Sequence, residues 1–162
     1  MKNIILSLLF ISSIYASNTE NNQLLNSLRE LENQHLENLL AKKITLKPIN
    51  GKSLLNLIQI NFNFYSKVKL LLDANIDLNY IDKDGNSIIQ NYQNLIKRYK
   101  KLYKRIKSNT IKEIQIFSDV PQLYKKILLE KNGKKVVLRS INYQQHLLKK
   151  AIKLIKYKKE EK

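Results

Sequence analysis

The chain has 162 residues, of which 43% are hydrophobic and 27% charged, an ordinary composition for one globular domain with a modest core. Only 3 glycines and 2 prolines are present, too few turn-formers for a many-stranded β fold, so we expect a mainly α protein. The absence of cysteine excludes disulfides, cysteine metal ligands and lipid attachment through an N-terminal cysteine. The net charge of +17 is concentrated in residues 97–162, which hold 21 Lys and Arg against 5 Asp and Glu. This asymmetry indicates association with anions.

The first residues have the pattern of a secretory signal peptide. Lys2 precedes an apolar run from Ile4 to Ile14, and small residues follow it, with cleavage expected after Ala16. The run is shorter than the roughly 20 apolar residues that span a membrane. We therefore expect residues 1–16 to be a signal peptide and the mature protein to be periplasmic or secreted. Retention of this segment as an N-terminal anchor is the alternative.

Leucines at spacings of three and four predict an amphipathic helix over about 20–42, broken once near His35. Packing against its own domain is favoured over a coiled coil, because flanking positions lack sustained opposite charges. Pro48 and Gly51 mark a connector before a short helix that starts at Ser53. A second short helix is expected around 68–72. The leucines concerned are Leu24, Leu25, Leu28, Leu31, Leu36, Leu39 and Leu40.

The segment 68–79 resembles the second helix of an ankyrin repeat and its exit, and residues 80–87 resemble the β-turn finger that leads into the next repeat. Gly51 and Gly85 are 34 positions apart, against a family period of about 33. Asn75 occupies the place of the family's left-handed glycine. The resemblance covers about residues 24–107 and is specific at 68–90.

Two features qualify the resemblance to ankyrin repeats. Ser53 and Ser87 stand where a threonine caps the first helix of each repeat. Both units lack the proline and histidine of the family's Thr-Pro-Leu-His start.

The resemblance implies helical hairpins that bind an unidentified protein through the fingers and the inner helix face. The contacts that it implies come from Tyr80, Ile81, Lys83 and Asn86, with Phe62, Phe64 and Tyr65 as further candidates. Burial of these last aromatic residues is the open alternative.

A continuous helical pattern over about 87–107 predicts one long helix that closes the array. Its polar face is a candidate anion-binding surface. The basic residues on this face are Lys97, Arg98, Lys100, Lys101, Lys104, Arg105 and Lys107. The expected organisation is thus a signal peptide at 1–16, a helical array at 17–108 and a basic extension at 109–162 that packs on the array.

Within the extension, residues 111–117 alternate as a short strand or form another helix. Residues 135–139 are β-like and would pair with 111–117 around an intervening helix that starts near Pro121 and ends at Asn132 and Gly133. Residues 143–157 are expected to be helical, and the tail at 158–162 to be frayed.

Residues with catalytic or metal-binding potential are few. The two histidines, His35 and His146, are far apart in sequence, and no pair has metal-ligand spacing. Asp77, Asp82 and Asp84 lack the glutamate of a calcium loop, and turn capping explains them more simply. No glycine-rich phosphate loop occurs. We expect no enzyme activity and no cofactor.

The expected function is an exported protein–protein interaction module. The alternative is a cationic binder, through residues 97–162, of an anionic membrane surface or envelope polymer. Nucleic acid is the less favoured partner, because export and the excess of lysine over arginine both argue against it.

Overall fold

The computed structural model describes residues 19–109, 113–117, 124–128 and 131–161. This part of the chain is mainly helical, which confirms the class expected from the low glycine and proline content. The expected signal peptide lies outside the described residues. None of the helices described has both the length and the apolar character that a membrane crossing requires.

Contacts divide the chain into two units. Unit 1 consists of the described residues of Met1–Ile88 and Leu154–Lys162, and unit 2 of those of Ile89–Lys153. The expected boundary between a helical array at 17–108 and an extension at 109–162 stays a prediction, although the contacts assign residues 89–107 to unit 2.

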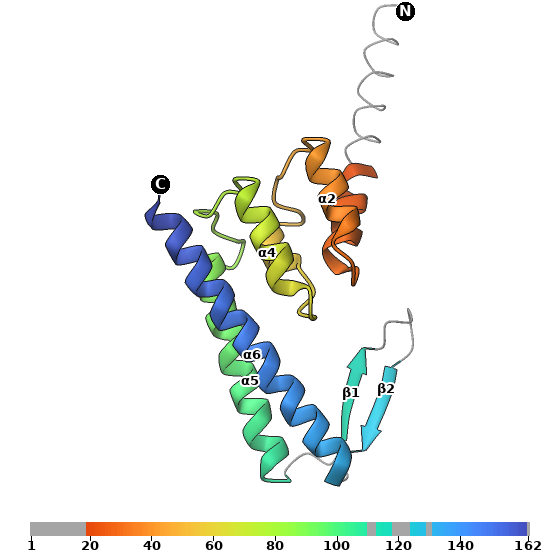
Figure 1. Cartoon of the computed structure of the whole chain (residues 1–162). Coiled ribbons are helices and arrows are strands. Elements are labelled where there is room, and N and C mark those ends of the chain that lie inside the picture. The colour runs from red at the N-terminus through yellow and green to blue at the C-terminus, as the bar shows by residue number, and fades with distance from the viewer. Residues whose placement is uncertain (1–18, 110–112, 118–123, 129–130, 162) are drawn as a thin grey trace, which may run out of the picture. The chain divides into compact units, whose positions relative to one another are not determined.

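Unit 1 begins with two short helices joined by a turn. Residues 19–29 are helical, and α2 follows at Gln34–Ala41 (Figure 1). The break predicted near His35 occurs just before it, at residues 30–33. Four of the seven leucines at helical spacing are buried in the core, as the pattern predicts. Those that are buried are Leu24, Leu28, Leu36 and Leu39.

A second pair of helices follows, α3 at Leu54–Leu57 and α4 at Phe64–Asp73. Ser53 occupies the N-cap of α3, as expected, but its buried hydroxyl has no hydrogen-bond partner among the described residues. The expected side-chain cap at Ser53 is therefore wrong. The physical reason is local: the Asn56 N–H, which such a cap would satisfy, donates to the backbone carbonyl of Ser53 at 2.9 Å.

Each helix pair ends in the same backbone geometry. Lys43 (φ 54°) follows α2 and Asn75 (φ 58°) follows α4, both in the left-handed region. The Lys43 N–H donates to the Leu40 carbonyl at 2.9 Å, and the Asn75 N–H donates to the Leu72 carbonyl at 3.1 Å. These bonds satisfy carbonyls that the helix ends would leave unpaired. The left-handed conformation expected of Asn75 is confirmed.

A tight turn then follows the first pair. Ile49 and Lys52 exchange two backbone hydrogen bonds of 3.0 Å across Asn50 (φ 51°) and Gly51 (φ 69°). Two consecutive residues with positive φ are typical of the two-residue hairpin turn that asparagine and glycine favour. A Cβ on Gly51 would lie 3.7 Å from the Lys83 side chain, so this turn and the finger at 81–87 are direct neighbours.

Lys67 joins the two helix pairs. Its side chain is fully buried in α4, and Nζ donates to the backbone carbonyls of Ser27 and, at 2.7 Å, Glu30. Asn63 adds a hydrogen bond from its side-chain amide to the Leu31 carbonyl. A lysine cation at the C-terminal end of helix 19–29 complements its dipole and its unpaired carbonyls. Burial lowers the pKa of Lys67, and the nearby Glu30 carboxylate partly opposes that change.

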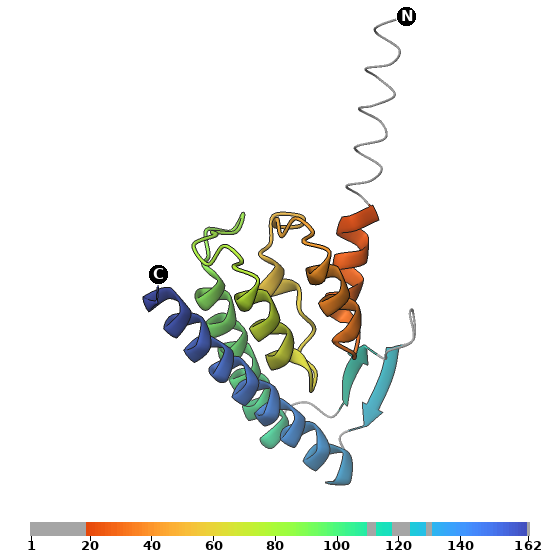
Figure 2. The same ribbon diagram turned by 45° about the horizontal axis from the view of Figure 1, so that its top comes forward.

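Unit 2 is built on two long helices, α5 at Ile88–Lys107 and α6 at Lys131–Glu160, that lie side by side in Figures 1 and 2. The helix expected over 87–107 is confirmed as α5. Lys134 of α6 donates from Nζ to the Lys107 carbonyl at 3.0 Å, at the C-terminal end of α5. The small core consists of Ile106, Val137 and Ile141, with Tyr99, Leu102, Tyr103 and Leu138 packed against it.

Between α5 and α6 in the sequence, the chain forms a two-stranded antiparallel sheet, β1 at Glu113–Phe117 and β2 at Tyr124–Leu128. A strand within 111–117 was one of the two alternatives, but its expected partner is wrong. The helix expected to start near Pro121 is also a wrong prediction, because residues 124–128 of that segment form the strand β2. Antiparallel strands that are close in sequence pair through a short connection.

The expected strand at 135–139 belongs to α6, and Gly133 lies inside this helix instead of ending a preceding one. Val137 and Ile141, one helical turn apart, are both buried against Ile106. Tertiary packing along this stripe outweighs the β preference of the valines. The tail expected to be frayed is helical to Glu160, so that expectation is wrong as well.

Candidate interaction surfaces

The finger at 81–87 is organised by one aspartate side chain. Asp82 Oδ1 accepts hydrogen bonds from the backbone N–H groups of Asp84 at 3.0 Å and Asn86 at 2.8 Å. The Gly85 N–H donates to the Asp82 carbonyl at 3.0 Å, and Gly85 has a φ of 75°, which only glycine adopts without strain. This confirms turn capping as the role of Asp82.

Two of the four finger residues predicted to bind a partner are exposed. Ile81 is 53% exposed and Lys83 is exposed, whereas Tyr80 and Asn86 are half-buried. The Asn86 side chain is also engaged in the turn, since its amide donates to the Asp84 carbonyl at 3.3 Å. Figure 2 shows this finger and the turn at 49–52 on the same side of unit 1.

The three aromatic candidates around the start of α4 have different environments. Phe62 is 63% exposed, Tyr65 is half-buried and Phe64 is fully buried. Phe64 as a binding residue is therefore wrong. It shares a helix face with Val68 and Leu71, four and seven positions on, and all three lie in the core. Phe62 precedes α4 and does not belong to this buried helix face.

Leu31 belongs to the predicted apolar stripe, but it is 45% exposed in the turn at 30–33. The hydrogen bond from Asn63 holds this turn next to the start of α4. Figure 2 shows the turn and the start of α4 at the end of the helix pairs away from the fingers. Leu31 in the turn and Phe62 before α4 are both exposed apolar residues. The structure does not bring the two predicted groups of contacts together.

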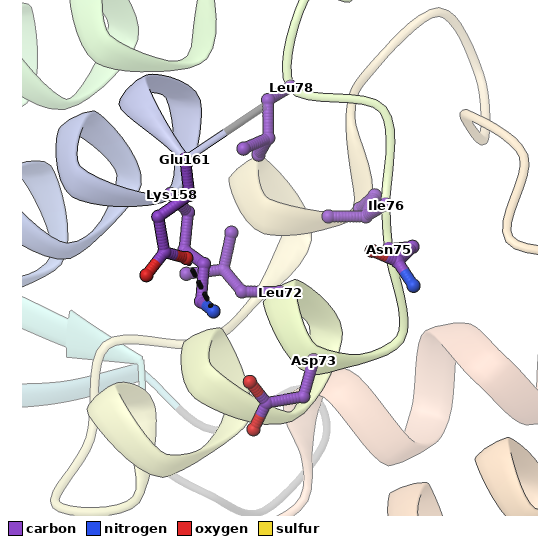
Figure 3. A pocket seen from close by; sticks show the side chains of 7 residues that line it. All are labelled: Leu72, Asp73, Asn75, Ile76, Leu78, Lys158 and Glu161. Carbon is purple, nitrogen blue, oxygen red and sulfur yellow. Dashed lines mark ion pairs between the residues drawn. The ribbon is translucent and has the colours of Figure 1, made fainter.

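A hollow of about 280 Å³ lies in unit 1 where the end of α4 meets the C-terminal turn of α6 (Figure 3). Lys158 Nζ and Glu161 Oε2 form an ion pair of 2.9 Å across its rim. This hydrogen-bonded pairing raises the pKa of Lys158 and lowers that of Glu161. No pattern in the sequence indicates this hollow, because its two sides are at least 80 positions apart. Its lining consists of Leu72, Asp73, Asn75, Ile76, Leu78, Lys158 and Glu161.

The candidate anion-binding residues form one exposed face of α5. This helix contains no Asp or Glu, and its seven cations are all exposed. None of them forms an ion pair with a carboxylate in the described part of the chain. Cations three and four positions apart repel one another, at a cost of about 0.2–0.5 kcal/mol per pair in a helix. An anionic partner would relieve this repulsion.

Unit 2 has a second cationic face, on α6, that the sequence analysis did not single out. Arg139, Tyr143, His146 and Lys150 recur at spacings of three and four, and all four are exposed. Tyr143 is 49% exposed. These spacings place them on one face of the helix, opposite the buried residues of the core.

The two histidines lie in different units of the structure. His35 Nδ1 lies 3.2 Å from Glu30 Oε2 on the surface of unit 1, and His146 is exposed on α6. Among the residues that the structure describes, no group of three or more His, Cys, Asp or Glu lies together as a metal site. Asp77 Oδ1 accepts a hydrogen bond from the Asn79 N–H at 2.8 Å, another turn cap.

Comparison with protein-family models, with curated proteins and with solved structures finds no match for this chain.

Proposed function

We propose that this chain is an exported, ankyrin-repeat-like module that binds another protein and carries out no catalysis. One observation supports the proposal above the others: each helix pair is followed by a left-handed residue and then by a turn centred on a glycine with positive φ. Lys43 and Gly51 hold these places after the first pair, and Asn75 and Gly85 hold them after the second.

The two turns also lie next to each other, as neighbouring fingers of a repeat array would. The side chain of Lys83 extends over Gly51. An array of adjacent fingers offers a partner several exposed backbone turns and side chains on one side of the molecule. Ile81 and Lys83 are the side chains best placed to make such contacts, with Tyr80 and Asn86 supporting the turn.

The finger assignment is tested by capture from envelope extracts with residues 17–162 as bait. We expect a partner that the wild type retains and that the double variant Ile81→Ala/Lys83→Ala binds about tenfold less well, the effect of one well-placed contact of roughly 1.4 kcal/mol. The matched control is Thr45→Ala/Lys47→Ala, which removes one exposed β-branched residue and one exposed lysine elsewhere in unit 1. Equal capture by all three proteins would show that the fingers are not the binding surface.

Export has its own test. The apolar run from Ile4 to Ile14 and the small residues after it support cleavage after Ala16. N-terminal sequencing of the protein purified from its native cells should give a chain that starts at Ser17. A chain that starts at Met1 and sediments with membranes would instead support a retained anchor.

A second function, binding of anions by the basic residues of unit 2, is supported by the unpaired cations of α5. The binding should weaken steeply as salt increases, because exposed charges are screened. Retention on an inorganic polyphosphate resin across a salt series tests it. Elution that does not depend on salt would contradict an electrostatic site.

A further inference from the structure

The cations of α5 are crowded into a short row. Seven Lys and Arg lie within residues 97–107, and a helix rises 1.5 Å per residue, so the row is about 15 Å long. A single small anion neutralises only one or two of these charges. The row instead fits a partner that presents many anions close together, either an extended polyanion or a bilayer surface.

The aromatic residues of unit 2 help to decide between these partners. Stacking on bases requires exposed rings beside the cations. On α5, Tyr92 is buried, and Tyr99 and Tyr103 are half-buried on the side that faces the core, so the cationic face of α5 offers no ring. Burial also raises the pKa of Tyr99.

On α6 an exposed ring does lie among cations. Tyr143 is flanked on its own helix face by Arg139 and Lys150, and Val136 is exposed one heptad before it. This face of α6 lies opposite Val137 and Ile141, which pack on α5, so it points away from the cationic face of α5. A flat surface that contacts the cations of α5 therefore does not contact Tyr143, and the attraction of those cations to anionic head groups needs no aromatic ring.

We propose that unit 2 binds the surface of an anionic phospholipid bilayer through the exposed cations of α5, which contact the head groups. This inference rests on the second proposed function, anion binding by unit 2, and narrows it to one partner. Five of the seven cations of α5 are lysines, which suit diffuse attraction to a charged surface better than bidentate readout of bases.

The test is co-sedimentation of residues 17–162 with vesicles of pure phosphatidylcholine and of phosphatidylcholine with one third phosphatidylglycerol. We expect binding to the anionic vesicles only. The triple variant Lys97→Gln/Lys101→Gln/Lys104→Gln should bind about 100-fold less well, because each cation near such a surface contributes about 1 kcal/mol. Glutamine keeps the helix propensity, and circular dichroism verifies the helix content.

Two further proteins sharpen the assignment. The control Lys42→Gln/Lys47→Gln/Lys52→Gln removes three exposed lysines of unit 1, and we expect it to bind as the wild type does. Tyr143→Ala, on the face of α6 that points away from the cations of α5, should bind the vesicles as the wild type does. If the control loses as much binding as the α5 variant, the location in unit 2 is wrong.

Comparison with soluble polyanions separates this inference from the function on which it rests. Retention on polyphosphate without vesicle binding would overturn the membrane proposal and leave anion binding intact. Tighter binding to a single-stranded DNA oligonucleotide than to anionic vesicles at the same salt concentration would overturn it in favour of nucleic acid. Binding to neither polyphosphate nor vesicles would overturn both.

Discussion

In both units a lysine side chain donates hydrogen bonds to carbonyls at the end of a helix, but the two lysines differ in burial. In unit 1 Lys67 donates to the carbonyls of Ser27 and Glu30 at the end of helix 19–29, and in unit 2 Lys134 donates to the carbonyl of Lys107 at the end of α5. Lys67 is fully buried, whereas Lys134 is partly exposed. A buried cation must be fully satisfied, because its desolvation is costly, and this makes Lys67 the more demanding of the two contacts.

The units differ equally in how they distribute charge. Unit 1 mixes acidic and basic residues and uses several of its aspartates as turn caps, as Asp77 and Asp82 show. In unit 2 the helix α5 carries seven exposed cations and no carboxylate. The two proposals follow this contrast, because turns form the proposed binding surface of unit 1 and charge forms that of unit 2. Three changes to stability test this contrast.

The largest effect is expected for Phe64→Ala in unit 1. Phe64 is fully buried, so its truncation should lower the free energy of unfolding by about 3–5 kcal/mol. Phe62→Ala, two residues earlier and 63% exposed, is the matched control and should change it by less than about 0.5 kcal/mol. Urea denaturation measures both. Similar losses for the two variants would mean that the aromatic residues around the start of α4 are wrongly placed.

We expect Lys67→Met to lower the free energy of unfolding by an intermediate amount, because methionine keeps the apolar stem and removes the hydrogen-bond donor. The carbonyls of Ser27 and Glu30 lose a partner, at a cost of about 1–3 kcal/mol. Lys69→Met, at an exposed position of the same helix, is the control. A variant as stable as the wild type would show that the buried lysine contributes nothing to joining the helix pairs.

The same variant has a pH dependence of defined sign. Burial lowers the pKa of Lys67 in the folded state, so the unfolded chain binds this proton more tightly. The stability that Lys67 confers therefore rises with pH between its folded pKa and its ordinary one. The difference in unfolding free energy between wild type and Lys67→Met should grow from neutral to alkaline pH. A difference that shrinks over that range would contradict the assigned burial.

The smallest change in the free energy of unfolding is expected in unit 2. Gly133 lies inside α6, so Gly133→Ala should stabilise the protein by about 0.5–1 kcal/mol through its helix propensity. Gly85→Ala is the contrasting variant in unit 1: its φ of 75° is left-handed, and alanine there should cost about 1 kcal/mol. Thermal denaturation distinguishes the two signs. Destabilisation by Gly133→Ala would indicate a turn at that position.

The helical class and most helices before residue 107 could be predicted from the sequence. Leucine periodicity placed the helices within 20–42, and Gly51, Asn75 and Gly85 marked three of the places where the backbone takes a positive φ. These features are local, because spacing along a helix and the sterics of a left-handed residue depend on a few neighbouring positions. They also placed the cationic face of α5 correctly on the outside.

The remaining features depend on contacts between distant segments. The β-like residues at 135–139 favoured a strand, but burial of Val137 and Ile141 against Ile106 makes this segment helical, and the strand partner of 113–117 is at 124–128 instead. The role of Lys67 likewise depends on the carbonyls of Ser27 and Glu30, which are 40 and 37 positions away. Local preferences are worth about a kilocalorie per mole or less per residue, and contacts between distant segments outweigh them.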